Sequence, residues 1–177
     1  FEAPGGHAVE ARVEPDRLDL DNHRDLALDV RESVRVLCIN GRPSGAPLGG
    51  SADFLRLALA PSDGALTAVR PDVAAESALL ERDLAQYQAV FLANVAQFTP
   101  AEARVLEGYL AGGGNLVVFL GDRVLPESYN RQLTAGEGGR PILPARIGPL
   151  ESRVQLRLDP LDYRHPMLAA FRGRHSA

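Results

Sequence analysis

The sequence contains no lysine and only one cysteine, and each of these absences limits what the protein can do. All 19 basic residues are arginines, which are scattered along the chain, and the formal net charge is −4. Nucleic-acid binding requires a concentrated stripe of positive charge that neutralises phosphates, so we expect no nucleic-acid partner. The single thiol, Cys38, allows neither an internal disulfide nor a zinc cluster built from cysteines.

Long apolar runs and clusters of metal ligands are also missing. No stretch approaches the roughly 20 apolar residues that span a bilayer, so we expect no direct membrane insertion. The four histidines, His7, His23, His165 and His175, are too dispersed to supply three or four convergent ligands, and we expect neither a metal nor a cofactor. Residues 14–22 are acidic enough to suggest a calcium loop, but they lack the EF-hand glycine and terminal glutamate, which favours a simple turn.

The first part of the chain has the pattern of antiparallel β-structure. Val9 and Ala11 alternate with charged residues, and a second alternating run follows at residues 26–30. A period of two is typical of half-exposed strands. We therefore predict a β appendage over residues 1–32, or the tail of a preceding β-sandwich. The chain also starts without a methionine, which indicates an excised part of a longer protein.

Residues 33–177 have the pattern of an α/β domain. Three nearly continuous apolar runs, at residues 34–39, 88–93 and 115–120, are typical of parallel strands that are covered on both faces. Joined by right-handed crossovers, such strands form a doubly wound, mainly parallel sheet. A composition of 45% hydrophobic and 24% charged residues supports one globular domain of this size.

The connecting segments contain helix signals of unequal quality. Thr99, Pro100 and Glu102 supply an N-cap, a first-turn proline and a capping box, and the three glycines at residues 112–114 supply a stop. Ser51 is expected to cap an earlier helix. The remaining expected elements are a strand at 66–69, helices at 76–85 and 127–133, a glycine-rich loop at 136–139 and an alternating strand at 153–158.

Three segments resemble the class I glutamine-amidotransferase-like superfamily, and its trehalose-utilisation-like branch in particular; they are residues 84–92, 98–114 and 165–168. Residues 19–24 and 36–41 resemble the junction before the amidotransferase-like module of membrane-anchored bacterial proteins of the planctomycete type, which also carry aerotolerance-type and von Willebrand factor A regions. The resemblance implies a flavodoxin-like fold for residues 33–177 and a preceding β region. It also implies an extracytoplasmic location in an envelope protein, with other envelope proteins or domains of the parent chain as partners.

The catalytic residue of that superfamily is missing from this chain. Amidotransferases of this class carry a cysteine nucleophile on the tight turn after a buried strand, where backbone N–H groups stabilise the oxyanion. Here the turn reads Leu120-Gly121-Asp122-Arg123 and holds no cysteine, serine or threonine. Cys38 lies inside the first apolar run, where burial makes a thiol unreactive. We therefore expect no catalytic residue and a core role for Cys38.

Polar residues follow the apolar runs, at the edge where ligands bind to open α/β sheets. The candidate ligand-binding residues are Arg42, Asn94, Gln97, Asp122, Arg123 and His165. Each also has a structural explanation, because charged side chains often cap loops and a histidine before a proline can simply pack in a turn. The loop at residues 40–51 fits neither a P-loop nor a dinucleotide fingerprint, and we expect a flexible connection.

Two hypotheses about function follow. In the first, the chain is a non-catalytic amidotransferase-like domain that acts as an interaction or scaffold module of a larger envelope protein. In the second, it is a hydrolase-like or carbohydrate-binding domain that uses the polar residues at the strand ends. A deep pocket that holds Asp122 and His165 together would favour the second hypothesis, and an open edge would favour the first.

Overall fold

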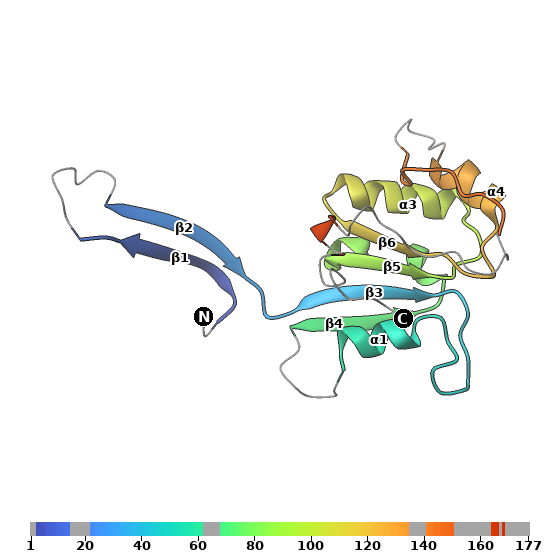
Figure 1. The fold of residues 1–177 in the computed structure, drawn as a ribbon, viewed down its shortest axis with the longest axis horizontal. Coiled ribbons are helices and arrows are strands. Elements are labelled where there is room, and N and C mark those ends of the chain that lie inside the picture. The colour runs from blue at the N-terminus through green and yellow to red at the C-terminus, as the bar shows by residue number, and fades with distance from the viewer. Residues whose placement is uncertain are drawn as a thin grey trace.

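The computed structural model describes residues 3–14, 22–61, 68–134, 141–150, 164–166 and 168. Its elements form two sheets, an antiparallel hairpin and a four-stranded parallel sheet with helices beside it (Figure 1). The predicted α/β class with a parallel sheet is therefore confirmed. In chain order the strands are β1 (Gly5–Arg12), β2 (His23–Val30), β3 (Val34–Asn40), β4 (Val69–Ala74), β5 (Ala89–Ala93) and β6 (Asn115–Phe119). The helices are α1 (Asp53–Leu59), α2 (Ala78–Glu81), the 3-10 helix η2 (Leu84–Gln86), α3 (Pro100–Ala111), α4 (Pro126–Tyr129) and the π-helix η3 (Asn130–Thr134).

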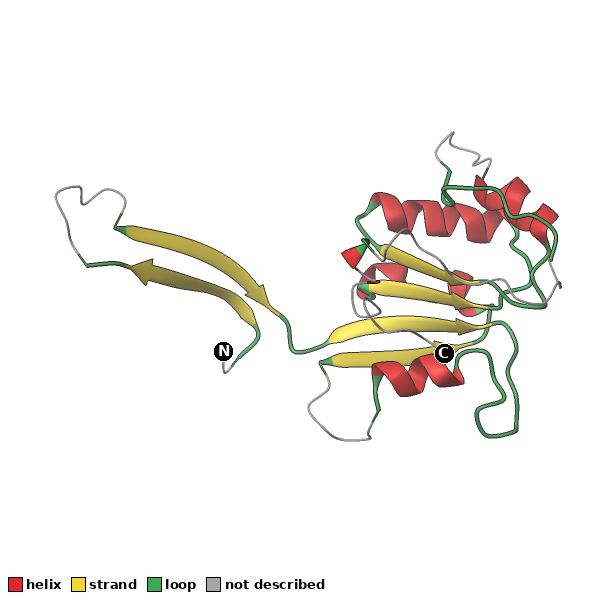
Figure 2. Ribbon diagram, in the orientation of Figure 1, coloured by secondary structure: helices red, strands yellow, loops and turns green. Residues whose placement is uncertain are grey.

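The parallel sheet has the strand order β4-β3-β5-β6, with β3 and β5 in the centre. Because side chains alternate along a strand, β3 divides its apolar residues between two sides. Leu37 and Ile39 pack in a cluster with α2 and α3, whereas Val36 and Cys38 pack in a second cluster with the residues around α1. Figure 2 shows α3 and α1 on opposite sides of the sheet. The sheet is therefore the middle of three layers.

Strand β4 differs from the expected strand at residues 66–69, because it runs from Val69 to Ala74. Its sequence includes Pro71 and Asp72, which hide the apolar pattern of a buried strand. Proline is tolerated here because β4 lies at the edge of the sheet, where a missing N–H can face away from the neighbouring strand. The position at the edge explains why this strand was misplaced.

The expected helix at residues 76–85 is divided into two short pieces. Helix α2 ends at Glu81, since Arg82 has an extended backbone, and the side chain of Asp83 then accepts a hydrogen bond from the N–H of Ala85 at the start of η2. Helix α1 also differs from the prediction. Its N-cap residue is Ala52, without a side-chain cap, so Ser51 does not cap it.

Helix α3 is the element whose ends were best predicted. The Oγ1 of Thr99 accepts a hydrogen bond from the N–H of Glu102 at 3.2 Å, and the carboxylate of Glu102 accepts one from the N–H of Thr99 at 2.7 Å. This reciprocal pair is the predicted capping box. Gly113 follows the helix with a φ of 91°, a conformation that glycine adopts without strain. The loop at 136–139 and the strand at 153–158 lie outside the described residues.

The hairpin is paired as predicted but is more exposed than its pattern suggests. Val9 lies opposite Leu26, and His7 opposite Leu28, so these side chains share one face. Val9 and Leu26 nevertheless stay 41% and 57% exposed. The hairpin projects away from the parallel sheet at the beginning of β3 (Figure 1). The apolar face of the appendage is therefore not part of the core.

Candidate functional site

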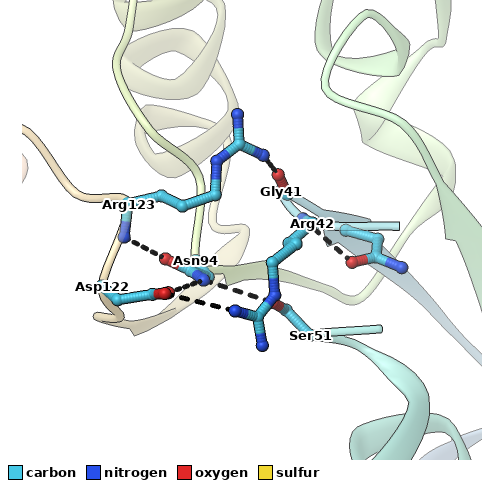
Figure 3. Close-up of polar contacts among 7 residues, drawn as sticks. Gly41, Arg42, Ser51, Asn94, Asp122 and Arg123 are labelled. Carbon is cyan, nitrogen blue, oxygen red and sulfur yellow. Dashed lines mark hydrogen bonds and ion pairs between the residues drawn. The ribbon is translucent and has the colours of Figure 1, made fainter. Parts of the chain in front are cut away.

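The carboxyl ends of β3, β5 and β6 meet at one edge of the sheet, and the polar residues that follow them form a connected network. Four of the six candidate residues, Arg42, Asn94, Asp122 and Arg123, are joined there (Figure 3). We call this group, together with Ser51, the edge network. It was expected from the sequence because parallel strands end on the same side of a sheet.

Asn94 is the centre of the edge network. Its Nδ2 donates to the carboxylate of Asp122 at 2.8 Å and to the Oγ of Ser51 at 3.3 Å, and its Oδ1 accepts a hydrogen bond from the N–H of Arg123 at 3.0 Å. Asn94 is only 7% exposed and has a φ of 55°. Asparagine tolerates this left-handed conformation better than most residues. Asn94 therefore ties the end of β5 to the turn after β6 and to the loop before α1.

Two arginines close the network on the side of β3. Nη1 of Arg42 lies 3.2 Å from the carboxylate of Asp122, and the guanidinium of Arg123 donates to the carbonyl oxygen of Gly41. The side chains of Arg42 and Asp122 are 53% and 64% exposed, so their ion pair is screened by solvent and contributes little to stability. The hydrogen bond from Asn94, supported by the charge of Arg42, lowers the pKa of Asp122. Asp122 is therefore ionised at neutral pH and accepts hydrogen bonds without donating any.

Two glycines allow the three strand ends to come this close. A Cβ added to Gly41 would overlap the backbone carbonyl of Asn94, and one added to Gly121 would overlap its side-chain amide. Sequence reasoning passed over both glycines, although each directly follows or nearly follows an apolar run. It also assigned Ser51 to a helix cap rather than to Asn94. A glycine immediately after a buried strand was the available signal for a close approach.

The turn after β6 lacks the backbone geometry of a nucleophile elbow as well as the nucleophile. Such an elbow is sharp and strained. Among the described residues, the non-glycine residues with positive φ are Leu48 and Asn94, and none lies between Leu120 and Arg123. The turn holds no cysteine, serine or threonine, and Asp122 within it is engaged by Asn94 and Arg42. The turn is thus an unstrained connection held by hydrogen bonds.

Cys38 lies in the interior of β3 with no solvent exposure. Burial, with a smaller contribution from the negative charge of Asp72, raises the pKa of its thiol from 9.0 to about 11. A thiol that stays protonated at neutral pH is a poor nucleophile. Cys38 is therefore a core residue, as predicted.

The hydrogen bonds that form the edge network do not include the other two candidates, Gln97 and His165. Gln97 lines a separate cavity of about 570 Å³ beside α4, together with Glu127 and Arg131. The segment of residues 164–166, which is red in Figure 1, lies near the beginning of β5 and β6. Neither Asp122 nor His165 lines the cavity beside α4 or the cavity beside the turn after β6.

A second feature lies beside the turn after β6. Residues 143–150 run past this turn. The side-chain amide of Asn130 holds them at Ile147: it accepts a hydrogen bond from the N–H of Ile147 at 2.7 Å and donates one to the carbonyl oxygen of Ile147 at 2.8 Å. Between this segment and the sheet lies a cavity of about 580 Å³, which we call the apolar groove. It is lined from the sheet side by Val118, Leu120, Gly121, Val124 and Pro126 and from the other side by residues 143–150. Its size falls within the range of small-ligand sites.

The fold and the edge network define an α/β domain with a hydrogen-bonded polar edge. In the part of the chain that the structure describes, no three histidine, cysteine or acidic side chains lie together as a metal site requires. Nor is any helix in the described ranges long and apolar enough to cross a membrane. Searches for similar proteins returned no matching family model, no curated protein and no solved structure.

Proposed function

We propose that residues 33–177 form a non-catalytic domain of the glutamine-amidotransferase-like type, which serves as an interaction or scaffold module of a larger bacterial envelope protein. Numbered within the sheet, β3 to β6 lie in the order 2-1-3-4, which agrees with the first four strands of a flavodoxin-like sheet. The N-terminal hairpin stands where the resemblance expects the end of a preceding β region. Both observations support the proposal.

The observation that carries the proposal is the state of the turn after β6. An amidotransferase needs a nucleophile there, an exposed strained backbone and free N–H donors for the oxyanion. In this chain Asp122 is held by Asn94 and Arg42, and the N–H of Arg123 is already used by Asn94. The place of the reaction is therefore occupied by contacts that hold loops together.

An activity assay tests the absence of catalysis. We expect no release of ammonia from glutamine and no hydrolysis of activated esters above the level of an Asp122→Ala variant. The matched control is Asp25→Ala, which removes an exposed carboxylate of β2 far from the edge network. Turnover that disappears in Asp122→Ala and persists in Asp25→Ala would overturn the proposal in favour of an enzyme.

One observation favours the alternative of a small polar ligand, such as a carbohydrate. Arg42 and Asp122 are both more than half exposed although they are paired, so their outer hydrogen-bonding positions remain available to solvent. Titration of the protein with trehalose and glucose, followed by amide NMR shifts, tests this alternative. Saturable shifts at the amides of residues 41, 42 and 121–123 that vanish in Asp122→Ala would support a sugar site, and their absence would remove it.

A further inference from the structure

The apolar groove is separate from the edge network, although the two lie beside the same turn. None of the five network residues is among the described residues that line the groove. The groove begins at Val118, near the carboxyl end of β6, and ligands of open α/β sheets bind beyond that end of the strands. Its place in the fold and its volume of about 580 Å³ therefore make it a candidate ligand site in its own right.

The floor of the groove is apolar and continuous with the core. It consists of four partly buried lining residues that also pack against the larger core cluster, namely Val118, Val124, Leu143 and Ile147. Covering such a surface with an apolar group is favourable in proportion to the area that is removed from water. A sugar would lose hydrogen bonds between its hydroxyl groups and water there without replacing them. The floor therefore suits an alkyl chain.

The rim of the groove extends this apolar surface towards solvent. Leu120 and Leu150 both line the groove, and they are 55% and 77% exposed. A single exposed leucine needs no explanation, but exposed apolar side chains that gather around one cavity are typical of a binding site. A ligand that lies along the floor would cover part of both leucines.

Hydrogen bonds fix the wall formed by residues 143–150. At its beginning, the carbonyl oxygen of Leu133 accepts hydrogen bonds from the N–H of Ile142 at 2.8 Å and from the N–H of Leu143 at 3.1 Å. Further along, the side chain of Asn130 holds Ile147. A cavity whose wall is already in place binds a ligand without the cost of ordering that wall. The groove is therefore preformed, as small-molecule sites usually are.

Arg146 determines the charge of the ligand. It is exposed, and it alone carries a charge among the described residues that line the groove. A guanidinium can donate two parallel hydrogen bonds to a carboxylate or a phosphate. A single arginine matches the one negative charge of a carboxylate, whereas a phosphate monoester carries up to about two at neutral pH and calls for a second cation. The groove therefore favours a carboxylate.

We propose that the apolar groove binds an aliphatic carboxylate of medium chain length, with its alkyl chain on the floor and its carboxylate at Arg146. This inference goes beyond the proposed function, because a scaffold module needs no small ligand. It also does not depend on the edge network, whose side chains do not line the described part of the groove.

Titration with octanoate below its micelle-forming concentration, followed by amide NMR shifts, tests the site. We expect saturable shifts at the amides of residues 118–121 and 143–150. Each methylene that the floor covers strengthens binding about fourfold, so octanoate should bind roughly 15-fold more tightly than hexanoate. Octylammonium has the same chain with the opposite charge, and it should bind at least about fivefold more weakly than octanoate.

Two single variants locate the ligand, and each has a matched control. Leu120→Asp places a charge at the rim and should weaken octanoate binding about tenfold. Its control is Leu26→Asp in the hairpin, because Leu26 is 57% exposed and Leu120 is 55% exposed. Arg146→Glu replaces an attraction by a repulsion and should weaken binding at least about fivefold. Its control is Arg56→Glu, which changes an exposed arginine of α1. Both controls should bind octanoate like the original protein.

Reversing the charge of the ligand together with that of the protein gives the decisive result. Arg146→Glu should bind octylammonium more tightly than the original protein does, because the floor is unchanged and the charge at the wall now matches. A misfolded variant would lose both ligands, so this gain separates a lost ion pair from a lost fold.

Three results would overturn the inference. The first is octanoate binding that Arg146→Glu leaves unchanged. The second is a set of shifts in the hairpin that Leu26→Asp removes, which would indicate adsorption to any exposed apolar surface. The third is a spectrum without saturable shifts in the groove. None of these results bears on the proposed absence of catalysis, which the ammonia assay tests separately.

Discussion

The hairpin and the parallel sheet are built from strands of similar length, but they differ in what covers them. Strands β1 and β2 have eight residues each, and no residue in either is fully buried. Strand β3 has seven residues, of which the last five are buried. The difference arises because helices pack on both sides of β3, whereas the hairpin projects alone. Cover from neighbouring elements, and not strand length, decides which sheet holds the fold together.

A second difference concerns the sequence pattern of the two regions. The hairpin alternates apolar and polar residues, which suits a sheet with one covered face. The core strands have continuous apolar runs, which suit a sheet covered on both faces. The hairpin thus has the sequence of a half-buried sheet without a described partner for its apolar face. A strand pattern predicts how many faces will be covered, but it does not say which molecule covers them.

Truncating one leucine in each region should show the largest difference in stability between the parallel sheet and the hairpin. Leu92 of β5 is completely buried in the larger core cluster, so Leu92→Ala should lower the free energy of unfolding by roughly 2–5 kcal/mol. Leu26→Ala in the hairpin removes a side chain that is 57% exposed. This variant should change the free energy of unfolding by less than about 0.5 kcal/mol. Urea denaturation gives both values. Similar losses would mean that the hairpin is part of the cooperative core.

Adding one methyl group to a glycine in each region should give a smaller difference in stability between the two regions. A Cβ on Gly41 would overlap the carbonyl of Asn94, so Gly41→Ala should destabilise the fold by roughly 1–3 kcal/mol. Gly6 in β1 has nothing within 4 Å of an added Cβ, and Gly6→Ala should be close to neutral. Thermal unfolding followed by circular dichroism measures both effects. A neutral Gly41→Ala variant would show that the strand ends are not held as closely as the structure indicates.

The smallest contrast concerns alkaline pH and the buried thiol. Because the pKa of Cys38 is raised to about 11, the unfolded chain loses its thiol proton first, and stability falls as the pH rises from about 9 towards 11. At pH 10, one unit above the pKa of the unfolded thiol, this loss should be about 1.4 kcal/mol relative to a Cys38→Ala variant. The comparison with Cys38→Ala cancels the titration of tyrosines. An Ala27→Cys substitution in the Cys38→Ala background places the thiol on the exposed hairpin, where no such loss is expected.

The sequence predicted the core strands well where their apolar runs were continuous. Strands β3, β5 and β6 and helix α3 were found because burial on both faces and a capping box leave strong local signals. Strand β4 was misplaced because an edge strand tolerates Pro71. The helix after β4 was predicted too long, since an apolar spacing alone does not show where Arg82 turns the backbone into an extended form.

The candidate site was predictable to the extent that strand ends determine it. Arg42, Asn94, Asp122 and Arg123 come together because each follows a parallel strand within a few residues. Gln97 lies further from its strand and lines another cavity, because the path of a longer connection is not encoded in the strand pattern. The left-handed backbone of Asn94 depends on contacts with three segments and has no signal in the local sequence.

Pro71 has a consequence for how the protein behaves at high concentration. Open-ended fibrils require a sheet that can grow at both edges, so that each molecule receives one neighbour and offers a template for the next. In the parallel sheet of this protein, Pro71 leaves the outer edge of β4 without one of its donors. Edge-to-edge growth through β4 is therefore disfavoured, which limits the ability of this sheet to seed polymerisation.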